Sequence, residues 1–176
     1  MGNVSIALRA EIENAVGSVL ADTITGNHLS NVIDGGAGDD FLEGSTGNDF
    51  ITGGAGDDIF QFGIGDGQDV IDEQRLAGRD SIRLIQFPTL DSLEDDVKFT
   101  LEGRDLVIDL NLDNSDVNDG QIRITNQVWG SFRIETLEFN GTEVDLAALT
   151  DQVAPGVDSF RITGETGNFG QLVVPV

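Results

Sequence analysis

Four aspartates and one asparagine recur at nine-residue intervals between Gly17 and Gln61, and each follows a glycine by five positions. These residues are Asp22, Asn31, Asp40, Asp49 and Asp58, after Gly17, Gly26, Gly35, Gly44 and Gly53. Glycine permits tight turns with positive φ and lets backbone carbonyls approach an ion without a Cβ in the way. Calcium takes roughly six to eight oxygen ligands, so one carboxylate per turn with converging carbonyls suits it. The spacing therefore predicts a series of calcium-binding turns.

In register, the array has five units: GSVLADTIT, GNHLSNVID, GGAGDDFLE, GSTGNDFIT and GGAGDDIFQ. Only the third and fifth units carry the full GGxGxD pattern. The first two units lack the second and fourth glycines, and the second also lacks the carboxylate, so we expect them to shape the fold and to bind calcium weakly or from one side. The candidate ligands and turn residues are Gly17, Asp22, Gly26, Asn31, Gly35, Gly36, Gly38, Asp40, Gly44, Ser45, Gly47, Asp49, Gly53, Gly54, Gly56 and Asp58.

The eighth residue of every unit is apolar. These residues are Ile24, Ile33, Leu42, Ile51 and Phe60. Since side chains alternate along a strand, only the eighth of the last three residues of a unit points inward, and stacked units would bury this column as a core. A disordered linker is the alternative for a glycine- and aspartate-rich segment. It is disfavoured because a linker has no reason to keep an apolar residue at every ninth position.

The array matches G-G-x-G-x-D-x-U-x and thereby resembles the RTX, or haemolysin-type, calcium-binding repeats. The resemblance implies a parallel β-roll in which two units make one coil. Each ion then lies between turns eighteen residues apart, which pairs Asp22 with Asp40, Asn31 with Asp49, and Asp40 with Asp58. About three to five calcium ions follow from this pairing of turns.

The segment Phe62 to Glu73 loses the nine-residue period but keeps three acids, Asp66, Asp69 and Asp72. It resembles the exit of an RTX roll, where carboxylates out of register close the last calcium site. We assign the three acids to that role, and a solvated acidic turn is the alternative.

From Arg79 the pattern changes to short alternating segments separated by turn residues. The expected strands are Ser81–Ile85, Val97–Leu101, Leu106–Leu110, Gln121–Thr125 and Glu135–Phe139, with Val4–Leu8 before the repeats and weak strands at Phe160–Thr163 and Gln171–Val174. Helical turns are expected at Leu90–Asp95 and Val144–Leu149. The region from Phe62 to Thr150 resembles the β-rich module that follows RTX repeats. The fold class is therefore all-β, a calcium-binding parallel β-roll followed by a β-rich C-terminal cap.

Two features of this cap leave alternatives open. Trp129 beside Arg133 offers a surface for a sugar or a protein partner, although a buried tryptophan at the end of the roll is favoured. The loop from Asp113 to Asp119 is rich in oxygen ligands, but it lacks the glycine and terminal glutamate of an EF-hand, and a solvated loop is favoured.

Charge and composition exclude several classes of function. The net charge is −23, and the fourteen acids between Ala10 and Gln74 have no lysine or arginine among them. Nucleic acid and anionic membrane surfaces are poor partners for such a chain because phosphate binding requires clustered cations. Cysteine is absent, no apolar run is long enough for a membrane span, and the first residues do not resemble a cleaved signal peptide.

No catalytic motif is recognised in the sequence, so no catalytic residue and no enzymatic activity are predicted. His28, the single histidine, lies in a degenerate repeat, and no HExxH or GxSxG pattern is present. In the adjacent acids of Asp39-Asp40 and Asp57-Asp58, we expect one ligand and one solvated neighbour.

The predicted organisation has four parts: a lead-in strand over 1–16, the roll over 17–73, the cap over 74–150, and a tail over 151–176 that holds a secretion signal or the start of a further module. The resemblance implies a module that folds on calcium outside the cell and supports type I secretion and folding of a larger bacterial protein. Its partners would be calcium, the type I exporter and the parent polypeptide, and its location the extracellular space or the bacterial cell surface. An accessory module of a secreted protease, lipase or polysaccharide-modifying enzyme, and an adhesin or carbohydrate-binding module with a glycan partner, are the alternatives.

Overall fold

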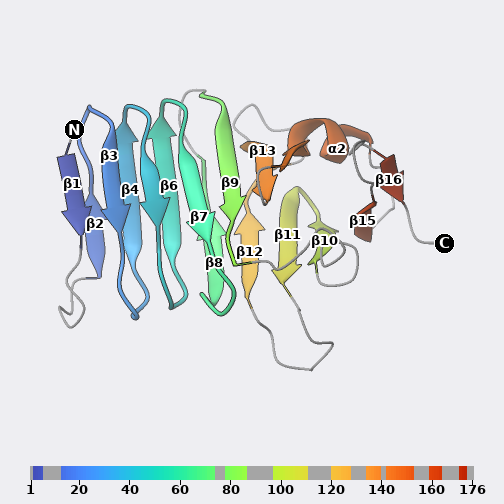
Figure 1. Cartoon of the computed structure of the whole chain (residues 1–176), viewed down its shortest axis with the longest axis horizontal. Coiled ribbons are helices and arrows are strands. Elements are labelled where there is room, and N and C mark those ends of the chain that lie inside the picture. The colour runs from blue at the N-terminus through green and yellow to red at the C-terminus, as the bar shows by residue number, and fades with distance from the viewer. Residues whose placement is uncertain are drawn as a thin grey trace.

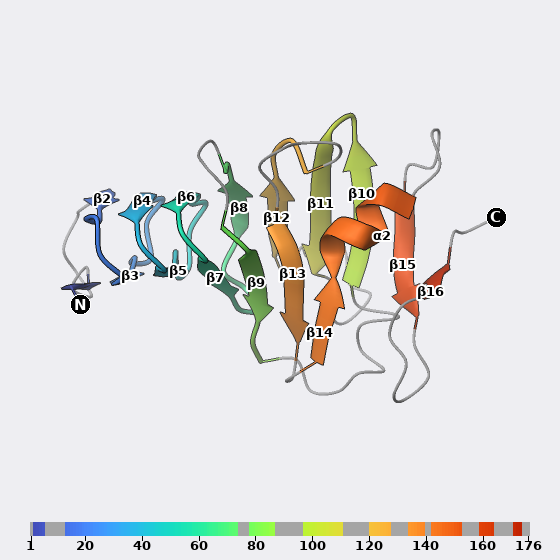
Figure 2. The same cartoon turned by 90° about the horizontal axis from the view of Figure 1, so that it is seen from above.

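The chain forms two long β-sheets joined by its turns (Figures 1 and 2). The structure is a computed structural model that describes residues 2–5, 13–73, 78–86, 97–110, 120–127, 134–139, 142–152, 159–163 and 171–173. One sheet has seven strands in the order β1-β3-β5-β7-β9-β13-β14, and the other has nine in the order β16-β15-β10-β11-β12-β8-β6-β4-β2. The prediction of an all-β fold with a parallel β-roll and a β-rich cap is confirmed.

The repeat strands alternate between the two sheets and pair in parallel. In the seven-stranded sheet they are β1 (Gly2–Ser5), β3 (Asp22–Thr25), β5 (Phe41–Glu43), β7 (Ile59–Phe62) and β9 (Asp80–Leu84). In the nine-stranded sheet they are β2 (Asn14–Val16), β4 (Val32–Ala37), β6 (Phe50–Ala55) and β8 (Gln68–Ile71). Leu42 lies opposite Ile24 on one side and Phe60 on the other, which is a register of eighteen residues. Two units therefore make one coil.

The eighth residue of each unit fills the space between the sheets, as the sequence predicts. Ile24, Ile33, Leu42, Ile51 and Phe60 are all 0% exposed. At about 25 cal/mol per Å² of buried apolar surface, burial of this column stabilises strands that are too short to be stable alone. The same core continues through Ile71 and Ile82 into the cap without a break.

The repeat itself continues for two turns beyond Gln61. The sixth-position acids occur at Asp40, Asp49 and Asp58 and then, after steps of eleven residues, at Asp69 and Asp80. Each of the two added units, Phe62–Asp72 and Glu73–Arg83, carries two extra residues before its G-x-D. The strict period of nine ends at Gln61, because it cannot accommodate these insertions.

The cap extends both sheets of the roll. Strand β12 (Gln121–Ile124) pairs in parallel with β8, and β13 (Ile134–Phe139) pairs in parallel with β9. The remaining elements are β10 (Val97–Glu102), β11 (Asp105–Leu110), β14 (Thr142–Asp145), α2 (Leu146–Gln152), β15 (Ser159–Thr163) and β16 (Gln171–Val173). In the cap, β10, β11 and β12 pair antiparallel, as do β13 and β14. The change from parallel to antiparallel pairing thus occurs within continuous sheets.

The five strands expected between Ser81 and Phe139 are present, displaced by at most one residue at either end. The first strand begins at Gly2 instead of Val4 and is described over Gly2–Ser5, and residues 6–8 of the expected strand lie outside the described residues. One further expectation needs correction. The helix begins at Leu146 instead of Val144, because Thr142–Asp145 forms a strand paired with β13. Asp145 then acts as the N-cap of the helix, since its carboxylate accepts a hydrogen bond from the Ala148 N–H at 2.7 Å. The expected helical turn at 90–95, the oxygen-rich loop at 113–119, Trp129 and Arg133 lie outside the described residues.

Candidate metal centre

The sixth-position side chains form two lines of hydrogen bonds, one along each edge of the roll. In each line the backbone N–H of one sixth residue donates to the side chain of the next along the edge. We call the first line the Asp22 ladder. Its N–H···O distances are 2.8 Å from Asp22 to Asp40, 2.8 Å from Asp40 to Asp58, 3.0 Å from Asp58 to Asp80 and 2.8 Å from Asp80 to Glu135. The Asn31 ladder runs from Asn31 to Asp49 at 2.7 Å and to Asp69 at 2.9 Å. The pairing of turns eighteen residues apart that the RTX resemblance implies is thus present in the backbone geometry.

The second carboxylate oxygen separates the later repeats from the first two. In Asp40, Asp49 and Asp58 this oxygen, Oδ2, is buried and accepts no hydrogen bond. An unsatisfied buried acceptor costs about 1–3 kcal/mol, and more when it is charged. These three oxygens are therefore the places where the fold most needs a cation.

The first two units satisfy the equivalent side chain internally. Ser18 donates to Asp22 Oδ2 through both its N–H, at 2.7 Å, and its hydroxyl, at 2.8 Å. The Asn27 N–H donates to Asn31 Oδ1 at 2.8 Å. Ser18 and Asn27 are the second residues of their units. In these two degenerate units, the side-chain oxygen that could bind a cation already accepts a hydrogen bond from the second residue of the same unit.

In the next three units the second residue takes a left-handed conformation. The φ angles are 102° at Gly36, 71° at Ser45 and 112° at Gly54, whereas Ser18 and Asn27 have negative φ. A Cβ at Gly36 would collide with the Ser18 carbonyl, and one at Gly54 with the Gly36 carbonyl. The glycines are therefore required both by the dihedral angle and by the close stacking of one turn on the next.

Burial raises the pKa of the ladder carboxyls, and neighbouring acids raise it further. The pKa rises to about 6 at Asp49, about 7 at Asp58 and Asp69, and about 8 at Asp80, and it is also raised at Asp40. In each case the largest cause is burial, which disfavours the charged form. A bound divalent cation would reverse this preference. One carboxylate per turn, together with the carbonyl oxygens of the turns, is a donor set that fits calcium.

The neighbouring fifth residues lie outside this arrangement. Asp39 and Asp57 are exposed, and they form an outer line in which the Asp57 N–H donates to Asp39 at 3.0 Å and the Arg79 N–H donates to Asp57 at 2.9 Å. Each adjacent acid pair therefore divides into one buried and one exposed carboxylate, and the exposed member is the solvated neighbour that the sequence predicts.

The three acids of the exit segment have different positions. Asp69 belongs to the Asn31 ladder. Asp66 lies close enough to Asp49 for the charge of Asp66 to add to the effect of burial, which raises the pKa of Asp49. Asp66 also accepts a hydrogen bond from the Gly63 N–H at 2.6 Å. Asp72 lies away from the ladders, where it accepts a hydrogen bond from the Thr125 hydroxyl at 2.6 Å. The geometry thus groups Asp66 and Asp69 with Asp49 and places Asp72 at the contact with β12.

Sequence reasoning missed three buried or half-buried acids: Glu73, Asp80 and Glu135. Glu73 accepts hydrogen bonds from the N–H groups of Gly53, at 2.6 Å, and Gly54, at 3.4 Å. Asp80 and Glu135 continue the Asp22 ladder. Asp80 was detectable, because Gly78-Arg79-Asp80 repeats the G-x-D of Gly56-Asp57-Asp58. Glu135 was not, since only the pairing of β13 with β9 brings it to the ladder.

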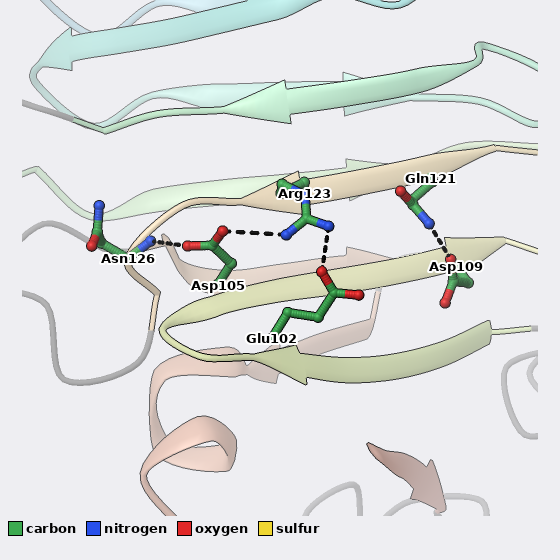
Figure 3. Close-up of polar contacts among 6 residues, drawn as sticks. All are labelled: Glu102, Asp105, Asp109, Gln121, Arg123 and Asn126. Carbon is green, nitrogen blue, oxygen red and sulfur yellow. Dashed lines mark hydrogen bonds and ion pairs between the residues drawn. The ribbon is translucent and has the colours of Figure 1, made fainter. Parts of the chain in front are cut away.

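Several other polar groups of the described residues have structural partners, whereas the buried Thr100 hydroxyl has no hydrogen-bond partner. On the outer face of the nine-stranded sheet, Arg123 binds Glu102 at 2.6 Å and Asp105 at 3.2 Å (Figure 3). Among the described residues no three acidic or histidine side chains converge as a metal centre made of side chains alone, and no helix is long and apolar enough to cross a membrane. Calcium sites in this part of the chain therefore depend on backbone carbonyls.

Comparison with known proteins identifies the repeats. The family profile of the RTX calcium-binding nonapeptide repeat, in its four-copy form, matches residues 16–47 and 34–71. No curated protein sequence matches the chain. Among solved structures, the AlgE6R3 subunit of the Azotobacter vinelandii mannuronan C5-epimerase, a solution structure, is similar at 21% identity over 97% of this chain and 99% of that one, with a TM-score of 0.36. Residues 16–71 of this protein are an array of RTX calcium-binding nonapeptide repeats.

Proposed function

We propose that the protein is a calcium-responsive folding module of a larger secreted bacterial protein. The observation that carries this proposal is the set of unpaired, buried oxygens on Asp40, Asp49 and Asp58. A fold that leaves three such oxygens without partners is incomplete until a cation binds them.

The candidate ligands follow from the same geometry. The carboxylates of Asp40, Asp49 and Asp58 bind calcium together with carbonyls of the stacked turns, and Asp66 and Asp69 complete the last site of the Asn31 ladder. Asp22 and Asn31 contribute less, because Ser18 and Asn27 already supply them with hydrogen bonds.

Calcium binding stabilises the folded state of the roll through thermodynamic linkage. Calcium binds the folded roll and not the extended chain, so at a calcium concentration about a hundredfold above Kd each independent site adds about 2.7 kcal/mol. Where calcium is scarce, repulsion within a segment of fourteen acids and no basic residue keeps the roll open. An open chain can pass a narrow exporter, so we assign the module to type I secretion and place its folded state outside the cell or on its surface.

The cap depends on the roll in this proposal. In this order of events the roll strands form first, and β12 and β13 of the cap then pair in parallel with β8 and β9. We retain the division into a lead-in over 1–16, a roll over 17–73, a cap over 74–150 and a tail over 151–176 as folding units. Calcium-driven folding of the roll then directs the folding of the cap.

The test is far-UV circular dichroism of the full chain during a calcium titration from micromolar to ten-millimolar concentrations, about the span over which calcium sites are tuned. Magnesium serves as the matched control, because it demands a smaller octahedral site and gives up its water reluctantly. A transition from coil to β-structure with calcium alone supports the proposal. The same β-spectrum in the absence of divalent cations would overturn it.

A further inference from the structure

One row of residues crosses the outer face of the nine-stranded sheet from the roll into the cap. Each strand contributes one residue, which lies opposite its neighbours on the adjoining strands. From β4 to β11 these residues are Val32, Phe50, Val70, Arg123 and Val107. Their side chains point away from the core, because the residues before and after each of them in its strand are buried or belong to the buried ladders. This outer row is apolar except for Arg123.

In the cap, the arginine of the outer row is held in place by two carboxylates. The Arg123 guanidinium binds Asp105 of β11 at 3.2 Å and Glu102 of β10 at 2.6 Å, so its side chain crosses β11 on the outer face (Figure 3). Val107 lies on β11 opposite Arg123 and is 2% exposed. An arginine stem can pack on apolar surface while its guanidinium stays with carboxylates. In the cap, an apolar side chain of the row is thus buried beside an arginine.

In the roll, the outer row is exposed and has no arginine. Val32 is 47% exposed and Phe50 37%, and Val16, on the adjoining strand β2, is 71% exposed. Every large apolar side chain that the described residues expose comes from residues 16–50. The sequence has no lysine or arginine over residues 10–74, so this segment has no cationic side chain of its own to lay over the row. Neighbouring exposed apolar side chains of this kind mark an interaction surface.

An aspartate lies among these exposed apolar side chains. Asp34 is opposite Val16 on one side and Thr52 on the other, and it follows Val32 by two residues on the same face of β4. The Asp34 side chain is half-buried, and the ion pairs of the described residues do not include it. A carboxylate beside apolar surface attracts a cation with an apolar stem. The roll therefore presents the acid and the apolar side chains that the cap combines with Arg123.

The charge of the chain indicates what can occupy this surface. A second copy would bring a net charge of −23 against an equal one, and like charges in an interface are costly. A guanidinium can pair with the Asp34 carboxylate and also lie over the ring of Phe50 in a cation–π contact. Arginine suits this better than lysine, because its planar group stacks on aromatic faces and is more weakly hydrated.

We propose that Val16, Val32, Asp34 and Phe50, which we call the Asp34 surface, form a docking site for an arginine-bearing segment of a partner protein. The partner's guanidinium pairs with Asp34 and lies over Phe50, and apolar side chains of the same segment cover Val16 and Val32. The Asp34 surface is on the outer face of the sheet, whereas the ladders of sixth-position side chains follow the edges of the roll. The docking site needs a folded roll but does not depend on what drives its folding.

The probe is a short, fluorescently labelled peptide in which arginine and valine alternate. Its affinity for the full chain is measured by fluorescence anisotropy in calcium, and circular dichroism in the same buffer checks that each variant is folded. A second peptide with glutamate in place of arginine tests the sign of the charge. The Asp34 surface should bind the arginine peptide and not the glutamate peptide, because guanidinium and carboxylate charges are complementary only in the first.

Two variants of the surface are compared with two matched controls. Phe50→Thr removes the ring but keeps a residue that suits a strand, and Asp34→Asn removes the charge with almost no change of shape. Phe41→Thr is the control for the ring, because Phe41 is half-buried on the outer face of the seven-stranded sheet. Asp39→Asn is the control for the charge, since Asp39 is exposed in a turn and its loss changes the net charge equally.

Phe50→Thr should weaken binding of the arginine peptide by about tenfold or more, from loss of buried apolar contact. Asp34→Asn should weaken it about two- to fivefold, as loss of one exposed ion pair does, and both controls should leave the affinity unchanged. Val32→Thr, which keeps the shape of the side chain, repeats the test on the adjoining strand if Phe50→Thr does not fold.

Three outcomes would overturn the proposal. The first is a folded wild-type chain that does not bind the arginine peptide. The second is equal weakening by Asp34→Asn and Asp39→Asn with no effect of Phe50→Thr, which would show that the peptide responds to net charge alone. The third is self-association of the wild-type chain that Phe50→Thr abolishes in analytical ultracentrifugation, which would assign the surface to a second copy.

Discussion

The first two repeats and the three that follow share one backbone path but treat the sixth side chain differently. In the first two, the second residue donates to that side chain, as Ser18 does to Asp22. In the next three, the second residue has positive φ, and one oxygen of Asp40, Asp49 or Asp58 is left without a partner. We therefore expect the conformation of the second residue, more than the presence of the sixth-position acid, to decide whether a turn needs calcium.

The largest effect should come from changing pH in the absence of calcium, because it acts on all the buried acids at once. Their pKa values are raised from an ordinary 3.8 to about 6 at Asp49, 7 at Asp58 and 8 at Asp80. A raised folded-state pKa gives stability that is complete below the unfolded value and is lost as pH rises through the folded value. The calcium-free roll should therefore be folded near pH 4 and lose stability progressively toward pH 8.

The stability of the calcium-free roll is measured as a function of pH by circular dichroism. A chelating resin removes divalent cations from the buffers, because soluble chelators bind calcium poorly in acid. Calcium should reverse this pH dependence of stability, because only the ionised carboxylates bind calcium and protons compete with it for them. A calcium-free roll that is more stable at pH 8 than at pH 5 would contradict the burial of uncompensated acids in the later repeats.

The next largest effect should come from Asp40→Ala. Asp40 lies between two stacked turns on the same edge, receiving the Asp22 N–H and donating to Asp58. Loss of a charged ligand worth about 1.5–3 kcal/mol lowers affinity by about tenfold or more. Asn31→Ala, in a turn that satisfies its own side chain, should change affinity least. Isothermal titration calorimetry compares the two, with Asp39→Ala as the exposed control, and equal losses for Asp40→Ala and Asn31→Ala would show that the pairing of turns is wrong.

A smaller effect is expected at Gly54, where φ is 112° and an added Cβ would meet the Gly36 carbonyl. Gly54→Ala should lower the free energy of unfolding in calcium by about 1–3 kcal/mol from backbone strain, with the steric clash adding to it. Gly103→Ala is the matched control, because φ there is 70° but no atom lies within 4 Å of the added Cβ. Urea unfolding of both variants separates the strain from the clash, and equal losses would show that the turns have room to separate.

The roll was predictable from sequence because its signals are local and repeated. The buried column from Ile24 to Phe60 follows from the nine-residue period and the alternation of a strand. The contact of Glu135 with Asp80 was not predictable, since it depends on which cap strand pairs with β9. The role of Glu73 was hidden for a related reason: its carboxylate binds the N–H of Gly53, twenty residues earlier, across an insertion that breaks the period.

The smallest effect, and the sharpest test of the comparison, should come from Ser18→Gly. The substitution removes the hydroxyl that donates to Asp22 at 2.8 Å and allows the second residue the positive φ of Gly36 and Gly54. Without calcium, loss of this hydrogen bond should cost about 1 kcal/mol. With calcium, the first turn should gain affinity, because a positive φ at residue 18 also turns away the N–H that donates to the same Asp22 oxygen at 2.7 Å, and a cation can then compete for that oxygen. Ser30→Gly is the control, since the Ser30 hydroxyl accepts a hydrogen bond from the Asn48 N–H at 3.4 Å. Calorimetry that finds weaker calcium binding in Ser18→Gly than in Ser30→Gly would show that the second residue does not decide which turns bind.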